Sequence, residues 1–212
     1  MTHDSDRLRA DLARYYDQDA AERAARGLPD ERIARREWFI GRLRDEGRHR
    51  LLEIGTGPGV DAAAFLAAGL EVSGVDLSPA HVDLARKAGI DAHVATAQTL
   101  PFADAAFDAL WSMSVLMHMP DPDLDAALLE FARVLRPGAI AAFGMWGGDG
   151  TEGPNPDDTL DPPRYFNWRT DEAMSAAIAR HAQLESFDAL PVRAANGRSF
   201  HYQWAVARFG DR

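Results

Sequence analysis

Residues 51–59 read LLEIGTGPG, and this stretch decides how the chain folds. The apolar residues 51–54 predict a short buried strand, and a helical pattern begins directly after the last glycine. Glycine can adopt positive φ and lets a ligand approach the backbone closely, so the glycines at alternate positions predict a tight turn at the helix N-terminus. The stretch therefore predicts a strand, a ligand-binding turn and a helix, which together open an α/β fold.

The spacing of the three glycines separates this turn from a dinucleotide-binding one. A GxGxxG motif would have its third glycine at position 60, where this chain has Val60, and Glu53 lies two residues ahead of the first glycine. A carboxylate beside the turn repels a pyrophosphate and attracts a cationic ligand. The sequence therefore favours a positively charged nucleoside and disfavours a nicotinamide oxidoreductase.

The alternation of strand and helix continues beyond the turn. The patterns predict helices at 61–68, 78–88 and 123–135, and strands at 70–76, 90–95, 109–114 and 140–146. Ser78 is the expected N-cap of the second of these helices. Right-handed crossovers between such units give a parallel sheet whose carboxyl strand ends meet at one edge, where ligands bind. Asp76 stands at one of these ends, about 20 residues after the glycines, the usual position for holding a ribose diol.

Four motifs in order resemble the class I S-adenosylmethionine-dependent methyltransferases. They are EIGTGPG from Glu53, GVDLS from Gly74, AQTLPFADAAFDALWSMSVLMHM from Ala97 and RVLRPG from Arg133. The resemblance runs from about residue 50 to about residue 146. It implies a Rossmann-like, doubly wound sheet of seven mostly parallel strands, with helices on both faces and an antiparallel last strand. It also implies S-adenosyl-L-methionine as the cofactor and S-adenosyl-L-homocysteine as its product.

The resemblance implies a cofactor site drawn from all of these motifs. The residues that it implies are Tyr16, Glu53, Gly55, Thr56, Gly57, Gly59, Asp76, Leu77, Thr96, Ala97, Gln98, Ser112 and Met113. The family usually has an acidic residue at the end of the third strand to bind the adenine amino group, and this chain has Thr96 there. Either Thr96 accepts that hydrogen bond, or Gln98 reaches the adenine instead.

The candidates for the acceptor side are Tyr15, His118, Trp146 and Tyr165. His118 follows the fourth strand, where a pKa near neutrality would suit a base; alternatively, it hydrogen-bonds the backbone and holds the loop. Tyr15 and Tyr16 touch the cofactor or substrate, or both pin the N-terminal extension to the core, or one points inward and the other outward. Because methyl transfer depends mainly on aligning acceptor, methyl and sulfur, neither a base nor a metal is required.

The length of 212 residues fits a single domain. We expect a helical extension over 1–49 with two helices, a cofactor-binding core over 50–146, and a third part over 147–212. That third part begins with a Gly-, Pro- and Asp-rich loop over 147–163, which is either a cover for the acceptor or an untethered surface loop. A helix capped by Thr170 and strands at 185–190 and 200–206 follow.

Composition and charge indicate the cellular location and the kinds of partner that we expect for this protein. The chain has no Cys, no long apolar segment and a charged N-terminus, which predict a cytoplasmic protein without disulfides or a membrane span. Its net charge is −10, and an acidic surface repels phosphate backbones, so nucleic acid is unlikely as a partner. The arginine-rich extension is either a local basic patch or a solvated helix face.

The resulting prediction is a methyltransferase, monomeric or homodimeric, that transfers a methyl group to oxygen, nitrogen or carbon of a small molecule. Two alternatives stay open: a tRNA or protein methyltransferase, and a non-catalytic regulatory protein that binds S-adenosylmethionine without methylating an acceptor. A basic patch beside the cleft would favour the first alternative, and the lack of an acceptor pocket would favour the second.

Overall fold

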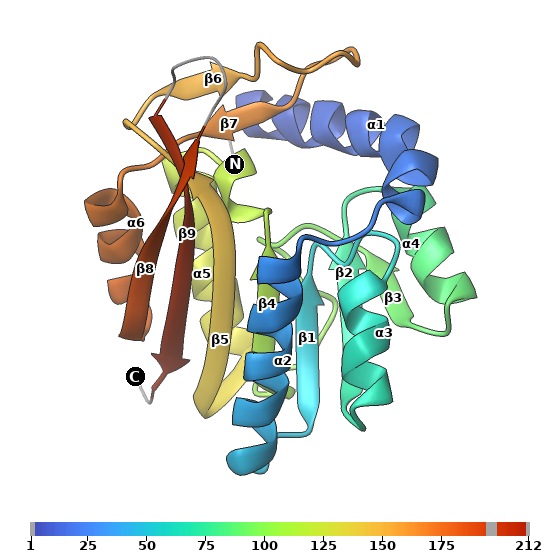
Figure 1. Cartoon of the computed structure of the whole chain (residues 1–212), viewed down its shortest axis with the longest axis vertical. Helices are drawn as coiled ribbons and strands as arrows, with labels where there is room; N and C mark the ends of the chain where they lie inside the picture. Colours follow the sequence, from blue (N-terminus) through green and yellow to red (C-terminus); the bar gives the residue numbers. More distant parts are fainter. Residues whose placement is uncertain (1–2, 194–198, 211–212) are drawn as a thin grey trace.

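The computed structural model describes residues 3–193 and 199–210, which form one large mixed sheet with helices on both faces (Figure 1). The strands of this sheet are β1 (Arg50–Ile54), β2 (Glu71–Asp76), β3 (Asp91–Val94), β4 (Phe107–Met113), β5 (Leu135–Gly147), β8 (Gln183–Arg193) and β9 (Ser199–Phe209). The helices are α1 (His3–Ala25), α2 (Asp30–Asp45), α3 (Val60–Ala67), α4 (Pro79–Lys87), the 3-10 helix η1 (Leu116–His118), α5 (Asp121–Val134) and α6 (Asp171–Ala179).

The seven strands lie in the order β3-β2-β1-β4-β5-β9-β8. Strands β1 to β5 pair in parallel, whereas β9 runs antiparallel to both of its neighbours, β5 and β8. The predicted seven-stranded, mostly parallel sheet with an antiparallel last strand is therefore confirmed. The strand order reverses between β1 and β4, and a ligand cleft is expected beyond the carboxyl ends of these two strands.

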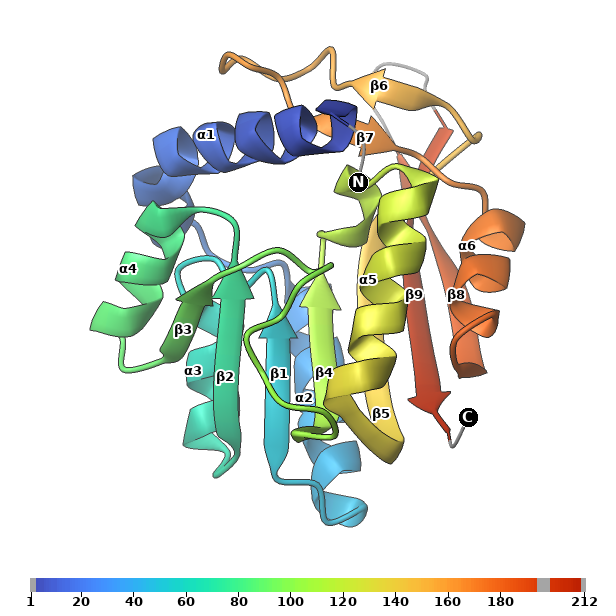
Figure 2. The ribbon, with the colours of Figure 1, turned by 180° about the vertical axis from the view of Figure 1, so that it is seen from behind.

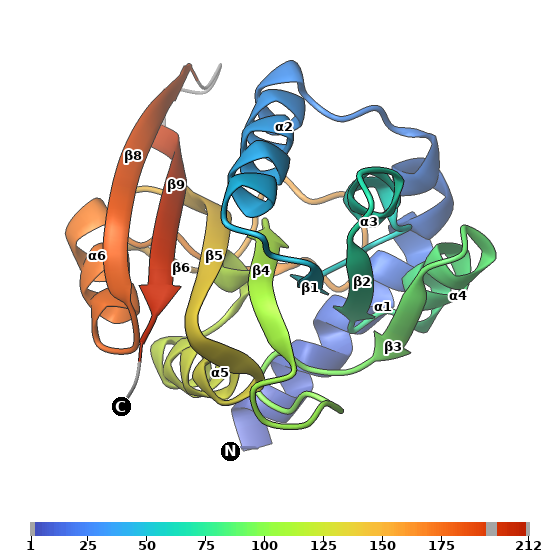
Figure 3. The same ribbon diagram turned by 90° about the horizontal axis from the view of Figure 1, so that it is seen from below.

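Two apolar layers hold the helices on the sheet. On one face, Phe39 of α2 and Phe65 of α3 pack around Trp111, with ring centroids 5.4 Å from Trp111 in both cases. On the other face, Phe131 of α5 stacks on Phe143 of β5, and α6 covers the neighbouring strands (Figure 2). Figure 3 shows α2 and α3 on one side of the sheet and α5 on the opposite side.

Helix α1 lies across the carboxyl ends of the strands (Figure 1). Two of its side chains tie it to the core: Asp17 accepts hydrogen bonds from the hydroxyl of Ser78 (2.6 Å) and the amide of Ala80 (3.1 Å), and Arg9 pairs with Asp123 at 3.0 Å. The two predicted N-terminal helices are present, and the first of them covers the ligand edge of the sheet.

The structure differs from the sequence prediction in the segment 147–163. This segment is not wholly irregular, because β6 (Glu152–Pro154) pairs with β7 (Tyr165–Asn167) in a second, two-stranded sheet. Strands of three residues are too short to produce a periodic hydrophobic pattern, which explains why the sequence indicated only a loop. The predicted N-caps are present: Ser78 accepts from the amide of His81, and Thr170 accepts from the amide of Ala173.

Within the described part of the chain, no helix combines the length and apolar character needed to cross a membrane.

Candidate active site

The glycine turn follows β1 and has the backbone conformation that its sequence predicts. Gly55 and Gly57 adopt φ of 73° and 54°, in the left-handed region where side chains are disfavoured. A Cβ at Gly55 would overlap the side chain of Val115, so only glycine fits there. A Cβ at Gly57 would meet no atom within 4 Å, and Gly57 lines the cavity described below.

Asp76 at the end of β2 fixes this turn. Its Oδ2 accepts a hydrogen bond from the amide of Gly57 at 2.8 Å, and its Oδ1 accepts from the amide of Ser78 at 2.9 Å. A carboxylate oxygen can accept more than one hydrogen bond, and Asp76 also lines the cavity. The carboxylate therefore connects the glycine turn to the start of α4 and retains acceptor capacity for a ligand.

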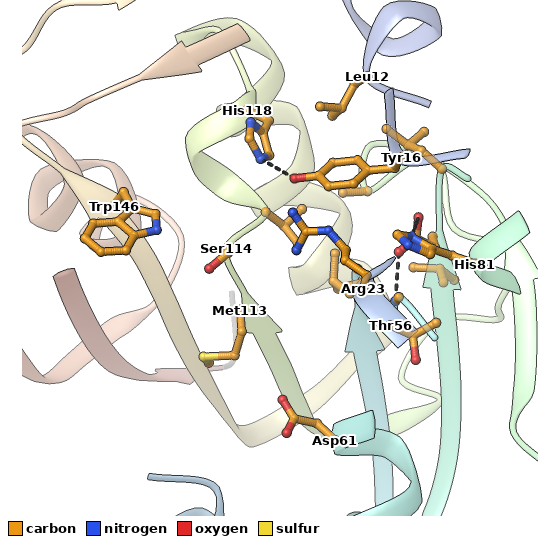
Figure 4. A pocket seen from close by; sticks show the side chains of 18 of the residues that line it. Leu12, Tyr16, Arg23, Thr56, Asp61, His81, Met113, Ser114, His118 and Trp146 are labelled. Carbon is orange, nitrogen blue, oxygen red and sulfur yellow. Dashed lines mark hydrogen bonds and ion pairs between the residues drawn. The ribbon is translucent and has the colours of Figure 1, made fainter. Parts of the chain in front are cut away.

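A cavity of about 700 Å³ lies between the glycine turn and α1 (Figure 4). This volume is within the usual range for small-molecule sites. One side is formed by the turn and the ends of β2 and β3, and the other by the ends of β4, β5 and β9 and the start of α2. Figure 4 shows Ser114 and Met113 between Trp146 on one side and Thr56 and His81 on the other.

Most of the predicted site residues line this cavity, and six do not. Those in its wall are Tyr16, Gly55, Thr56, Gly57, Asp76, Leu77, Ala97, Gln98, Met113, His118 and Trp146. Those outside its wall are Tyr15, Glu53, Gly59, Thr96, Ser112 and Tyr165.

Glu53 lies behind the cavity wall and not in it, although its charge was expected to attract a cationic ligand. Its carboxylate is buried and accepts a hydrogen bond from the Thr56 hydroxyl at 2.9 Å. Burial and the neighbouring Asp61 carboxylate raise the pKa of Glu53 well above its ordinary value, although Arg32 and the Thr56 hydrogen bond act in the opposite direction. Because burial disfavours the charged form, Glu53 supports Thr56 in the cavity wall and does not itself face a cationic ligand.

Thr96 and Gln98, the two candidates for the adenine contact, differ in whether they line the cavity. Thr96 forms an isolated bridge with Thr99 and lies outside the cavity wall. Gln98 is in the wall, and its amide nitrogen is 3.4 Å from the carbonyl oxygen of Asp123. Gln98 is therefore the polar side chain of this pair that can reach a ligand.

Of the two tyrosines of α1, only Tyr16 lines the cavity, and neither points outward into solvent. Tyr15 is buried, and the guanidinium of Arg164 lies 4.6 Å from its ring centroid. Tyr16 lines the cavity, and its hydroxyl is 2.8 Å from His118 Nε2. Tyr15 thus pins α1 to the segment that precedes β7, while Tyr16 faces the cavity. Tyr165, by contrast, directs its hydroxyl to Glu152.

His118 occupies a buried position between two hydrogen-bond partners. Its Nδ1 lies 2.8 Å from the carbonyl oxygen of Tyr165, which can only accept, so Nδ1 carries the proton. Its Nε2 is then the acceptor for the Tyr16 hydroxyl. Burial lowers the pKa of His118 to about 3, helped by the positive charges of Arg164 and Arg23. The pKa near neutrality expected from the sequence is wrong, because desolvation disfavours the charged ring.

This low pKa predicts a specific pH dependence of stability. Below the ordinary histidine pKa of about 6.5, the unfolded chain binds a proton at position 118 and the native chain does not, so the free energy of unfolding falls as the pH is lowered. Between pH 7.5 and 5.5 this contribution is about 1.4 kcal/mol. Urea unfolding at the two pH values should show a smaller loss for His118→Gln than for the wild type. Equal losses would mean that His118 titrates normally in the native state.

Two residues of the cavity wall were not among those predicted from the sequence, His81 and Arg23. His81 is 2% exposed, its Nδ1 lies 3.5 Å from Asp76 Oδ1, and neither ring nitrogen forms a hydrogen bond within the described residues. Arg23 reaches the middle of the cavity from α1 (Figure 4), and its guanidinium lies 4.7 Å from the Tyr16 ring centroid. Its Nε donates to Asp19 at 2.7 Å. Nothing distinguishes Arg23 in sequence from the other arginines of the extension, whereas His81 could have been found from its place in the first turn after the Ser78 cap.

Asp61 in α3 also lines the cavity and anchors α2 to the core. Its buried carboxylate accepts hydrogen bonds from Arg32 (2.8 Å) and Arg36 (3.0 Å) of α2 and from the indole of Trp111 (3.0 Å) in β4. Three donors from two elements converge on this one side chain. The start of α2, which forms part of the cavity wall, is therefore positioned through Asp61.

The fold and the cavity define an α/β protein with a Rossmann-like sheet and a ligand-sized cavity at the edge where the strand order reverses. Residues 52–143 match a family model described as a methyltransferase domain. This match supports the assignment of residues 52–143 to the class I methyltransferases, a family that uses S-adenosylmethionine as methyl donor.

Relatives of known sequence and structure agree with this assignment. Methyltransferase GfsG of Streptomyces halstedii is 38% identical over 117 residues, which cover 50% of this chain and 41% of GfsG. The 27-O-demethylrifamycin SV methyltransferase of Amycolatopsis mediterranei is 38% identical over 141 residues, covering 61% and 48% of the two chains. This chain thus spans about half the length of these relatives. A methyltransferase structure from Methanosarcina mazei shares the fold with a TM-score of 0.68, at 18% identity, and covers 78% of this chain and 94% of its own.

Proposed function

We propose that this protein transfers a methyl group from S-adenosylmethionine to oxygen, nitrogen or carbon of a small molecule by in-line displacement. The observation that carries the proposal is the cavity of about 700 Å³ that the glycine turn and Asp76 share with Trp146. Such a volume leaves room for an acceptor beside a nucleoside cofactor. The Amycolatopsis relative is named as a methyltransferase of 27-O-demethylrifamycin SV, which supports a small-molecule acceptor.

The polar groups of the cavity fit this cofactor. Asp76 retains acceptor capacity for the ribose hydroxyls, and the unpartnered ring nitrogens of His81 lie beside it. Gln98 supplies an amide for the adenine edge. Among the described residues, Arg23 bonds to protein only through Nε, so its two Nη groups are free to bind the carboxylate of the amino-acid end. We therefore assign these four side chains to the cofactor.

When bound, S-adenosylmethionine supplies a methyl group already activated on a sulfonium, so the chain has to bind and orient its ligands and to exclude water. Helix α1 performs the last of these tasks by covering the cavity (Figure 1). Arg164 fastens this cover from the opposite segment, because its guanidinium lies over the rings of Tyr15 and Phe166 and pairs with Asp158.

His118 is assigned a positioning role in this proposal. With its Nδ1 proton committed to the Tyr165 carbonyl, its Nε2 accepts the hydrogen bond of the Tyr16 hydroxyl. The lone pairs of the Tyr16 oxygen then stay available to a ligand. A residue whose pKa is about 3 removes few protons at neutral pH, so the reaction proposed here does not depend on His118 as a base.

A pair of glycine variants tests the cofactor site. Gly57 and Gly47 both have positive φ (54° and 63°), and a Cβ on either meets nothing within 4 Å, so valine introduces similar backbone strain at both positions. Only Gly57 faces the cavity. Gly57→Val should reduce the affinity for S-adenosylhomocysteine by more than 30-fold in calorimetry, while Gly47→Val should bind like the wild type. Equal affinities of the two variants would show that the turn does not contact the cofactor.

The expectations of a monomer or homodimer and of a cytoplasmic location stay predictions. Light scattering and cell fractionation test them directly.

A further inference from the structure

The residues that β5, β8 and β9 contribute to the cavity wall, together with Ser114 after β4, have a composition of their own. We call the part of the cavity that they line the acceptor chamber, and they are Ser114, Trp146, Leu190, Tyr202 and Trp204. Three of these five side chains are aromatic. Trp146 and Tyr202 meet edge to face, with ring centroids 5.3 Å apart and planes at 84°. Walls of this kind favour a flat apolar ligand.

A glycine in the neighbouring strand leaves the space that the hydroxyl of Tyr202 occupies. Gly144 of β5 lies opposite Trp204 in the register, and a Cβ at Gly144 would come within 2.5 Å of the Tyr202 oxygen. The contacts of this hydroxyl are long: 3.5 Å to Ser114 Oγ and 3.8 Å to Met113 Sδ. At such distances the hydrogen-bonding capacity of both hydroxyls is largely unused.

Ser114 presents the second hydroxyl from an unusual backbone conformation. It follows β4 with φ of 61°, a region that residues other than glycine rarely adopt, and its amide donates to the Gly144 carbonyl at 2.6 Å. Strained residues of this kind cluster at ligand sites, where the surrounding structure holds them in place. The strain at Ser114 is consistent with a hydroxyl that serves a ligand.

The charged groups around the chamber neutralise one another. Arg35 stacks on Trp204 with its guanidinium 4.7 Å from the ring, donates to Glu31 at 3.0 Å and lies 3.6 Å from Asp188. Arg32 is paired with the buried carboxylate of Asp61. With both guanidinium groups paired, the chamber offers no uncompensated charge to an ionic group of an acceptor.

We propose that the acceptor chamber binds a neutral, flat aromatic acceptor whose hydroxyl group hydrogen-bonds with Tyr202 and Ser114. This inference rests on the proposed methyltransferase function and adds the substrate class. Because burial raises the pKa of Tyr202, its hydroxyl stays protonated at neutral pH and can donate as well as accept. Both hydroxyls lie beside Met113, because Ser114 follows it in the chain and the Tyr202 oxygen is 3.8 Å from its sulfur. Figure 4 shows Met113 and Ser114 between Trp146 and the residues Thr56 and His81 of the opposite wall, so an acceptor hydroxyl bound there faces the cofactor.

The test uses 2-naphthol as an aromatic alcohol and 2-naphthoate as its anionic counterpart, both titrated into the full chain saturated with S-adenosylhomocysteine. Binding is followed by ligand-observed NMR, so no turnover is needed. The wild type should bind 2-naphthol at least 5-fold more tightly than 2-naphthoate. Tyr202→Phe and Ser114→Gly should each weaken 2-naphthol binding about 3- to 10-fold, the usual effect of one lost hydrogen bond. Both variants should leave the affinity for S-adenosylhomocysteine unchanged.

Tyr165→Phe is the matched control, because it removes a tyrosine hydroxyl that bonds to Glu152 outside the cavity. It should bind 2-naphthol like the wild type. If S-adenosylhomocysteine binds but 2-naphthol does not, if both chamber variants bind it normally, or if 2-naphthoate binds more tightly, the inference is overturned while the proposed function stands. Failure of S-adenosylhomocysteine itself to bind would instead overturn the proposed function.

Discussion

Asp76→Ala should weaken the binding of S-adenosylhomocysteine by about 30- to 1,000-fold, equivalent to about 2–4 kcal/mol. Two effects contribute to this expected loss of affinity. The carboxylate accepts hydrogen bonds from the amides of Gly57 and Ser78, so its removal leaves both donors without their partner and loosens the glycine turn. It also lines the cavity, where its remaining acceptor capacity serves the ribose. Hydrogen bonds to charged groups are each worth about 1.5–3 kcal/mol.

Glu71→Ala is the control for this change, because Glu71 is an exposed carboxylate at the opposite end of the same strand. Calorimetry should give this variant the affinity of the wild type. If Asp76→Ala also binds normally and remains folded by circular dichroism, Asp76 has no part in the cofactor site.

Asp61→Ala should destabilise the protein by about 3–5 kcal/mol, the usual range for removing one partner of a buried ion pair. The change leaves Arg32, Arg36 and the indole of Trp111 without their shared acceptor, and two of these donors hold α2 on the sheet. For a chain of this length, each kcal/mol lowers the melting temperature by about 2–4 °C. Thermal unfolding followed by circular dichroism measures the effect.

The matched control for Asp61→Ala is Asp83→Ala. Asp83 is an exposed carboxylate on α4 whose oxygen lies 3.9 Å from Arg86, and surface pairs of this kind contribute little to stability. The melting temperature of the Asp83→Ala variant should stay close to that of the wild type. Similar melting temperatures for the two variants would mean that the Asp61 cluster does not anchor α2.

Most of the fold could be predicted because its signals are local. The glycine turn, the Ser78 cap and the alternation of apolar segments each depend on neighbours in sequence, and the crossover rule then gives the sheet. The pairing of β6 with β7 could not be predicted, because two strands of three residues carry no periodicity.

The site could be predicted only in part, because some of its residues belong to local motifs and others reach the cavity from distant segments of the chain. Asp76 and Gly57 belong to motifs with a fixed spacing, and both lie in the cavity wall. Tyr202 and Arg23 reach the cavity through contacts between segments far apart in the chain, and no local pattern marks them. His118 was identified by position, but its low pKa depends on burial between Tyr16 and the segment around Tyr165, which the sequence does not specify.

A calorimetric titration of the wild-type chain should show whether the cavity beneath α1 binds S-adenosylmethionine. S-adenosylhomocysteine, 5′-methylthioadenosine and NAD would be titrated in parallel. S-adenosylhomocysteine should bind at one site with a micromolar dissociation constant, methylthioadenosine should bind more weakly because it lacks the carboxylate assigned to Arg23, and NAD should not bind. If S-adenosylhomocysteine does not bind, or if NAD binds equally well, the cavity is not a site for S-adenosylmethionine.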